Sequence, residues 1–473
     1  MKVTQVAVCP SEASTKAGRP ALTPELLAAS GARYSRNNEG LEAILSKIDP
    51  NHLEKSVDSI FRMVDYGHQS IADMVPVAMF IDGISMWLAY YLWTLSPTAG
   101  GQESSTRYIK LAVAGLIPPE ILGIPSRDIA EWQALMDACF QAYQSSLKVW
   151  EELAAENPGL MGIPQSLLED TSESAQKKVQ RMRRNYAFDR ARYFLPVTAA
   201  TNVMMIMSAR GWVQLCQQLL SQPLPEAQRL GELIRGDLEV PAPRMTKHAR
   251  ATEPARQAIA AEFGKLVRMA RHESSRGQNS RQAASEAGVP FLSVLPPAGV
   301  SEEEIARDLS YHENRYSPVG SSLQRMGVRF GWSAIGFAEI RDLNRHRTGT
   351  KYCPQVPKGF YFGFDQIPDM SAACEEKRAR LTKLADIGRQ STAKAHQRLA
   401  ESDPAYVYWT LLGTEYPFEH TTTADKFIYE AELRTGVGAH YRYAKHLRDA
   451  LALFYQQFPC ARGLILEGSA EPE

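Results

Sequence analysis

The sequence predicts an α+β protein that contains two tandem copies of one helix-rich domain. Two observations predict this arrangement. The first is an internal echo, in which strand-like stretches, long amphipathic helices and proline landmarks recur in the same order along the chain. The second is the length of 473 residues, which is enough for two or three domains with sizeable cores.

The first copy is expected over residues 1–245. It opens with a short strand from Val3 to Val8 and a helix after Thr23, which starts a partial capping box. An apolar segment punctuated by Gly and Ser follows over 74–95. Next, apolar residues recur every three or four positions, which predicts one apolar helix face. These residues are Ile129, Trp132, Met136, Cys139, Tyr143, Leu147 and Trp150.

The second copy is expected over 289–473, after a linker with helical pieces over 246–288. It repeats the strand (289–295), a capping box at 301–304, the apolar segment (326–347) and a long charged helix from about 374 to 401. Two further landmarks are expected to match at a shorter spacing. They pair Leu195-Pro196 with Tyr416-Pro417, and Ala227-Gln228 with Ala439-His440.

Composition excludes several classes of function. Lys plus Arg and Asp plus Glu both number 53, so the zero net charge argues against general attraction to nucleic acid or anionic membranes. No apolar run reaches the roughly 18 residues of a membrane span, and the N-terminus is too polar for a signal peptide. The six cysteines are scattered without CxxC spacing, so we expect no metal site, no disulfide framework and a cytoplasmic location.

The first candidate site is Gln102-Glu-Ser-Ser-Thr-Arg-Tyr108, directly after Gly100-Gly101. Hydroxyls and a guanidinium on a glycine-bearing loop suit a phosphate, and the Glu103 carboxylate could accept hydrogen bonds from a sugar or a base. The alternative is a loop before a helix, with Ser104 or Ser105 as its cap.

The second candidate site is Arg345-His346-Arg347, followed by Lys351. Two guanidiniums beside an imidazole predict a local anion site, although a solvated basic turn has the same composition. Four further residues are isolated candidates for ligand contacts, each with an ordinary structural alternative. Arg192, Arg210 and Arg434 could be surface salt-bridge partners, and His68 a polar loop residue.

Together these pieces resemble the flavin-dependent thymidylate synthases, or thymidylate synthase complementing proteins. That family carries R-H-R-x-x-S-x-N-E-x-S-x-R-Y, preceded by H-x-S/T-x-x-E-H and followed by R-x-x-L-P, N-x-R and R-x-x-x-x-A-Q/H. The two copies divide this pattern. The first copy keeps His68, Ser70, Gln102, Glu103, Ser105, Arg107, Tyr108, Arg192 and Arg210, and the second keeps Arg345, His346, Arg347 and Arg434.

Each copy lacks what the other retains. The first has Trp93–Leu95 or Leu95–Pro97 where the family has Arg-His-Arg, with Asp73 for a glutamate and Ser208 for an asparagine. The second has Tyr352-Cys353 in place of Asn-Glu. The losses are complementary, which predicts composite sites between the copies.

The resemblance implies a role for each retained residue. Arg345, His346, Arg347, Arg210, His68 and Ser70 would bind FAD. Gln102, Glu103, Ser105, Arg107 and Arg192 would bind dUMP, while Arg434 would polarise the pyrimidine and is the catalytic candidate. It also implies the family fold, with a small antiparallel sheet in each copy, and a homodimer equivalent to the family's homotetramer.

The activity implied is reductive methylation of dUMP to dTMP. Methylenetetrahydrofolate would supply the carbon, and FAD, recharged by NADPH, the hydride, so that the cofactor performs the difficult chemistry. The alternative is a degenerate flavin- or nucleotide-binding paralogue without synthase activity. A third hypothesis, a nucleic-acid clamp at 345–351, is disfavoured by the neutral charge.

Overall fold

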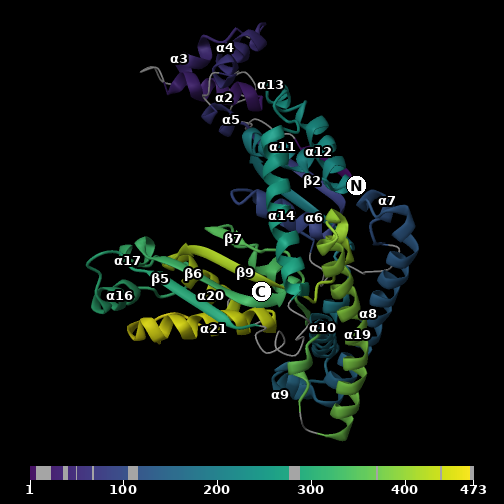
Figure 1. Ribbon diagram of the computed structural model, residues 1–473. Helices are drawn as coiled ribbons and strands as arrows, with labels where there is room; N and C mark the ends of the chain where they lie inside the picture. Colours follow the sequence, from purple (N-terminus) through teal and green to yellow (C-terminus); the bar gives the residue numbers. More distant parts are fainter. Residues whose placement is uncertain are drawn as a thin grey trace. The chain divides into compact units, whose positions relative to one another are not determined.

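A computed structural model describes residues 1–6, 23–35, 41–49, 51–65, 69–104, 115–275, 288–368, 371–436 and 439–468. The chain forms two compact units, each made of two separate stretches (Figure 1). Unit 1 contains Met1–Pro125 and Thr198–Phe263, and unit 2 contains Ser126–Val197 and Gly264–Glu473. The units are defined by which residues pack together, whereas the copies are defined by sequence similarity. Unit 2 therefore contains residues of both copies.

Unit 1 is built on an antiparallel sheet with the strand order β1-β2-β4-β3. Every second side chain along β2 and β4 is buried, because successive side chains of a strand point to opposite faces. Met79, Ile81 and Val203 lie on this buried face, whereas Phe80 and Ile206 are exposed. The strands are β1 (Lys2–Val6), β2 (Pro76–Ser85), β3 (Gly100–Glu103) and β4 (Ala200–Ser208).

Three helices of unit 1 are tied to its strands by hydrogen bonds; the first two directly follow β2 and β4, and the third comes after the second helix. Trp212 Nε1 donates to Val77 O at 3.0 Å. The fully buried Glu226 accepts from both Ser85 N and Ser85 Oγ, each at 2.8 Å, and so connects the β2–α6 junction to α12. The helices are α6 (Met86–Leu95), α11 (Ala209–Ser221) and α12 (Pro225–Leu238), with the short α7 (Pro119–Leu122) in the same unit.

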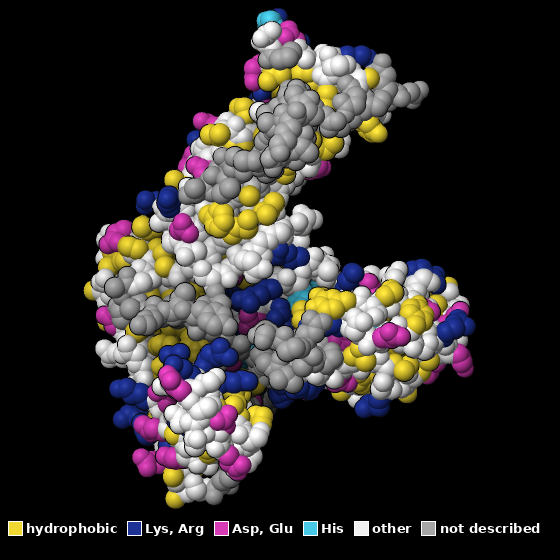
Figure 2. All heavy atoms as spheres, turned by 180° about the vertical axis from the view of Figure 1, so that it is seen from behind, with side chains coloured by type: hydrophobic (Ala, Val, Ile, Leu, Met, Phe, Trp, Pro, Cys, Tyr) yellow, Lys and Arg dark blue, Asp and Glu magenta, His cyan; other side chains and the backbone are white. Residues whose placement is uncertain are grey.

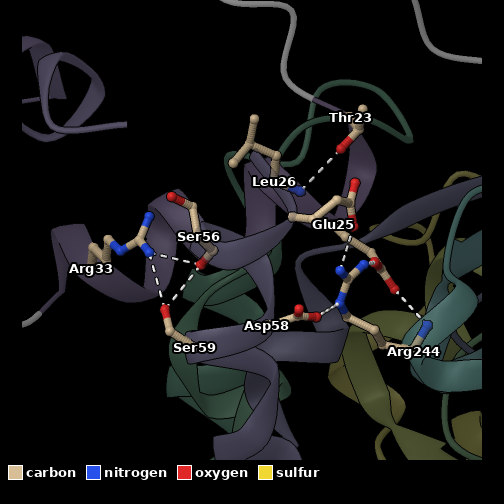
Figure 3. A network of polar contacts seen from close by, with 9 residues as sticks. Thr23, Glu25, Leu26, Arg33, Ser56, Asp58, Ser59 and Arg244 are labelled. Carbon is tan, nitrogen blue, oxygen red and sulfur yellow. Dashed lines mark hydrogen bonds and ion pairs between the residues drawn. The ribbon is translucent and has the colours of Figure 1, made fainter. Parts of the chain in front are cut away.

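The N-terminal helices of unit 1 gather around Arg244 (Figure 3). Arg244 Nη1 lies 2.5 Å from Glu25 Oε2, while its Nε and Nη2 contact Asp58 and Glu54. The predicted cap is confirmed, since Thr23 Oγ1 accepts from Leu26 N at 3.3 Å. The helices are α2 (Pro24–Tyr34), α3 (Leu41–Ser46), α4 (Leu53–Asp65), α5 (Ser70–Asp73) and α13 (Pro243–Thr246).

Unit 2 carries a second antiparallel sheet with the order β5-β6-β9-β7, and β8 pairs with β9. The predicted second strand is confirmed as β5, and the predicted capping box is complete, with Ser301 and Glu304 each accepting from the other's backbone. The strands are β5 (Pro290–Leu295), β6 (Gly327–Gly336), β7 (Thr350–Tyr352), β8 (Gly359–Phe360) and β9 (Thr414–Thr423).

The two sheets are equivalent strand by strand, which confirms the tandem repeat. Both have the same order, and the long central pair of each contains one register shift. The shift falls between Ile81 and Ile84 in unit 1 and between Trp332 and Ile335 in unit 2. The α+β fold class with a small antiparallel sheet in each copy is therefore confirmed.

The strand registers and the helix positions show that both predicted landmark pairs, one at a proline and one at an alanine, are wrong. In the register, Tyr416 occupies the position of Thr201, because they pair with Ile335 and Ile84. The counterpart of Leu195-Pro196 is therefore not Tyr416-Pro417. The pairing of Ala227 with Ala439 is also wrong, since Ala227 lies inside α12 whereas Ala439 precedes its helix. Short motifs misled here because connections between equivalent elements differ in length.

Two of the helices around the second sheet, α18 and α20, contain residues of the candidate functional site. The connection after β6 is short, so α18 starts at the end of the strand, and α20 similarly continues β9. The helices are α16 (Glu302–Leu309), α17 (Ser321–Arg325), α18 (Phe337–Leu343), α20 (Ala424–Thr435) and α21 (Tyr441–Gln457).

A helical bundle in unit 2 combines both copies. The predicted amphipathic helix is α8 (Ile129–Glu156), and the charged one is α19 (Ala372–Ala400). Trp132 Nε1 donates to Tyr408 O at 2.9 Å, and Pro196 forms an isolated β-bridge with Leu411. Figure 2 shows Lys and Arg beside Asp and Glu on this bundle. Such pairs include Lys377–Glu156, Arg380–Glu152 and Lys394–Glu131.

The remaining elements connect these parts. Most of the predicted linker 246–288 is one long helix, α14 (Glu253–Ser275). None of the described helices combines the length and apolar character needed to cross a membrane. The other elements are η2 (Ser126–Asp128), η3 (Pro158–Met161), α9 (Gln165–Glu169), α10 (Glu173–Ala191), η4 (Arg192–Phe194), η5 (Phe364–Gln366), η6 (Pro404–Trp409) and η7 (Pro459–Ala461).

Replacing Arg244 by Ala is expected to lower the free energy of unfolding by about 2 kcal/mol, because the buried Glu25 carboxylate loses its partner. Urea unfolding measures the change. The control is Arg235→Ala, which removes an exposed ion pair with Glu232 and should cost under about 0.5 kcal/mol. Equal losses in the two variants would contradict this account of the N-terminal helices.

Candidate functional site

The candidate site lies in unit 2, where a buried ion pair joins the two copies. Arg192 begins η4 in the first copy, and Asp342 lies near the end of α18 in the second. Arg192 Nη2 donates to Asp342 Oδ2 at 3.0 Å, and both side chains are almost fully buried. Burial opposes ionisation of Asp342, but Arg192 and Arg345 outweigh it and hold the pKa of that carboxyl below its usual range.

The predicted basic turn follows α18 directly. Arg345 Nη2 lies 3.7 Å from Asp342 Oδ1, so a single carboxylate lies between an arginine of each copy. Arg345 is 43% exposed at its side chain, whereas His346 points inward and is buried. Burial and the Arg345 cation lower the pKa of the half-buried Arg347.

Arg434 reaches this turn from α20. Its Nε donates to His346 Nε2 at 2.7 Å, so this imidazole nitrogen carries no proton. Burial agrees, because it lowers the pKa of His346 to about 3. The Arg434 guanidinium also lies 5.3 Å from the centre of the Tyr443 ring. The neutral histidine therefore orients the arginine instead of adding a positive charge.

The path of the chain after the turn depends on one glycine. Gly349 has φ +63, and a Cβ there would lie 2.0 Å from Thr421 O of β9. Lys351 Nζ donates to His346 O and Thr348 O, while His420 Nε2 lies 2.7 Å from Thr348 O. Gly349 and these contacts fix the carbonyls of His346 and Thr348 in the turn.

The remaining predicted residues do not join this cluster within unit 2. Gln102 and Glu103 lie on β3 in unit 1, with Gln102 exposed. Ser70 is the exposed first residue of α5. Arg210 is on α11 and forms an ion pair of 2.9 Å with Asp73. The predictions for His68, Ser105 and Arg107 lie outside the described residues.

Strand register identifies what replaced the lost motif residues. Gly100 pairs with Ile206 and Thr350 with Thr421, which are equivalent positions of β4 and β9. Tyr352 and Cys353 therefore occupy the positions of Gln102 and Glu103. Counting back along β3 favours Leu95–Pro97 over Trp93–Leu95 as the counterpart of the Arg-His-Arg turn.

The sequence interpretation missed the acidic and phenolic part of the site. Asp342 was overlooked although it precedes Arg345 by three residues, a spacing that brings side chains together on a helix. Glu339 is one turn earlier and fully buried, and Tyr193 Oη donates to its Oε1 at 2.7 Å. Two sequence signals point to this acidic and phenolic part of the site. They are the aspartate directly after Arg341 and the tyrosine directly after Arg192.

The arrangement suits anion recognition. The guanidiniums of Arg192 and Arg345 converge on the carboxylate of Asp342. Arg192 Nε is buried and has no hydrogen-bond partner among the described residues, so it retains a donor for a ligand oxygen. No group of three or more His, Cys, Asp or Glu in the described part of the chain could hold a metal ion.

Asp342→Asn is expected to lower the free energy of unfolding by about 3 kcal/mol at pH 7, because the buried Arg192 loses its counter-charge. The pKa of Asp342 is lowered by folding, so its stabilisation is complete above the unfolded value of about 3.9 and fades below it. Chemical unfolding at pH 7 and pH 3 should therefore show a smaller difference from the parent at pH 3. The exposed pair Asp386–Arg389 provides the control Asp386→Asn; an equal effect of both changes would refute the role of Asp342.

The chain resembles a protein family, a full-length relative in sequence and a solved structure. Residues 21–243 match the family model of the thymidylate synthase complementing protein. The UPF0159 protein Ta1429 of Thermoplasma acidophilum is 24% identical over 485 residues, covering 92% of this chain and 93% of that protein. The crystal structure of the UMP/dUMP methylase PolB from Streptomyces cacaoi, bound with 5-Br dUMP, is 14% identical, with a TM-score of 0.31 over 52% of this chain and 94% of that one. Residues 21–243 of the chain are therefore similar to the thymidylate synthase complementing protein family.

Proposed function

We propose that this protein is a flavin-dependent thymidylate synthase with composite sites between its copies. It converts dUMP to dTMP with methylenetetrahydrofolate, FAD and NADPH. The observation that carries the proposal is the sharing of Asp342 by Arg192 of the first copy and Arg345 of the second. The similarity of residues 21–243 to the thymidylate synthase complementing protein family supports the reaction, and the Asp342 contact supports a site that uses both copies.

The Arg-His-Arg turn fits the anionic part of FAD. Arg345 is partly exposed, and the lowered pKa of Arg347 reflects burial and a neighbouring cation, both of which an anion would compensate. Arg345 and Arg347 would hold the pyrophosphate, while His346 holds Arg434 in place. FAD, when bound, supplies hydride. Arg210, His68 and Ser70 are the further candidates for flavin contact.

The nucleotide would be held by Arg192 together with Gln102, Glu103, Ser105 and Arg107. The buried Nε of Arg192 suits a phosphate oxygen, because guanidinium forms short charge-assisted bonds to phosphate. Arg434 would stabilise negative charge on the pyrimidine, which is the role that makes it the catalytic candidate. We also propose a homodimer as the assembly equivalent to a tetramer of single-copy chains.

A degenerate binding protein is the second candidate function. Tyr352 and Cys353 occupy the strand positions of Gln102 and Glu103, so the second copy offers no carboxylate there. Conversely, the first copy has Leu95–Pro97 in place of the arginines. A chain that lost synthesis could therefore still bind flavin through Arg345 and Arg347.

Arg345→Ala is expected to weaken FAD binding about 10- to 100-fold while leaving dUMP affinity nearly unchanged, and Arg107→Ala should do the reverse. Titration of the flavin absorption band and calorimetry with dUMP measure the two affinities. Arg380→Ala, which lies in the bundle and pairs with Glu152, is the control. The composite site is wrong if both variants retain both parental affinities.

Purified protein with NADPH, methylenetetrahydrofolate and labelled dUMP is expected to yield labelled dTMP, because the motif halves together retain the arginines to which the resemblance assigns flavin and nucleotide binding. Product is measured chromatographically, and Arg434→Lys tests the polarising role, since lysine keeps charge but loses the planar fork. Flavin and dUMP binding without dTMP formation would favour the degenerate alternative.

A further inference from the structure

Three buried tyrosines connect two carboxyl groups of unit 2 through hydrogen bonds. Tyr193 Oη lies 2.7 Å from Glu339 Oε1, and Tyr441 Oη lies 3.4 Å from Tyr193 Oη. Tyr361 Oη lies 3.3 Å from Tyr441 Oη and donates to Asp365 Oδ1 at 2.5 Å. The five groups come from η4, α18, α21 and the segment after β8, so they form a continuous path between elements far apart in sequence.

The number of hydrogens along this path indicates the protonation state of Glu339. The path has four oxygen–oxygen contacts, but the three phenols supply only three hydrogens. If Tyr193 and Tyr361 donate to the two carboxylates, a shared hydrogen is missing at one phenol–phenol contact. A proton on Glu339 supplies the fourth hydrogen, and all four can then point from Glu339 toward Asp365.

The surroundings of Glu339 favour the same proton. Its side chain is fully buried, and Oε2 has no hydrogen-bond partner among the described residues. Burial raises the pKa of Glu339 to about 7, despite nearby cations. The titratable and charged groups around it are Arg192 and Tyr193 of η4, Asp342 of α18, Glu415 of β9, and Arg442 with Tyr441 of α21.

The other end of the path reaches water. The Asp365 side chain is 29% exposed, and Arg442 Nη1 donates to its Oδ2 at 3.0 Å. The same guanidinium lies 3.8 Å from the centre of the Tyr361 ring. Arg442 therefore holds both the last phenol and the terminal carboxylate in place, while Asp365 remains accessible to solvent.

We propose a proton relay from the buried first turn of α18 to solvent, formed by Glu339, Tyr193, Tyr441, Tyr361 and Asp365. In one transfer, the Glu339 proton passes to the Tyr193 oxygen, as each phenol passes its own proton to the next group. Asp365 gains the last proton and releases it to water. Four O–H bonds break and four form, and no electron is transferred between groups.

The use of the relay rests on the proposed function. Glu339 precedes Asp342 by one helical turn, and Tyr193 adjoins Arg192, so the buried end of the path borders the proposed nucleotide site. Methylation at C5 of dUMP replaces a hydrogen that must leave as a proton. The structure assigns Glu339 Oε2, which has no partner in the described part of the chain, as the acceptor at this end.

Tyr441→Phe and Tyr361→Phe each remove one oxygen from the path, so the Glu339 proton should exchange with D2O about tenfold or more slowly than in the parent. The measurement follows the C=O band of the protonated carboxyl by infrared spectroscopy at pH 6, and Glu339→Gln identifies that band. Tyr186→Phe is the matched control, because Tyr186 is buried beside Arg190 but lies outside the path. Denaturant unfolding verifies that each variant is folded.

Parental exchange rates in both folded path variants, or no Glu339 carboxyl band at pH 6, would overturn the relay. This readout needs neither dUMP nor flavin, so it separates failure of the relay from failure of the proposed synthase. If dTMP forms, the path variants should in addition lower kcat with an unchanged KM for dUMP. Rescue at higher pH, where hydroxide can take the proton, is expected for them and not for Tyr186→Phe.

Discussion

The carboxylate of Asp342 is the constraint on which the functional end of unit 2 depends. Two arginines from different copies converge on it, and the buried charge of Arg192 would be strongly destabilising without an opposite charge nearby. Because α18, η4 and the Arg-His-Arg turn all end at this group, their mutual positions are tied to one ion pair. Any change in the spacing of these elements would separate the buried charges of Arg192 and Asp342.

The two copies have kept one scaffold and lost different functional groups. Sheet order and the position of the register shift are the same in both, although few side chains agree. The open face of the first sheet exposes Phe80 and Ile206, whereas Arg329 and Glu419 form an ion pair on the second. The register of strand pairing has therefore changed less between the copies than the side chains have. A slip by one residue would move every side chain of a strand to the opposite face of the sheet.

Much of the fold could be predicted from the sequence, because it depends on local patterns. Periodic apolar residues located α8, and Ser301 with Glu304 marked the start of α16. The basic turn and Arg192 were also found. What could not be predicted is long-range: the Asp342 contact joins residues 150 positions apart, and nothing local distinguishes this aspartate from a solvated one. The false Tyr416-Pro417 landmark failed for the same reason, since chain order alone does not give register.

The interruption of each unit by a stretch of the other matters for how the chain is made. The helices α8 and α10 are synthesised between the two halves of unit 1, yet they pack in unit 2. During translation, the apolar face of α8, with Trp132 and Met136, therefore emerges long before its partner α19 exists. The part of α8 that packs on α19 therefore stays uncovered until the second copy has been synthesised, whereas its contact with α10 can form earlier.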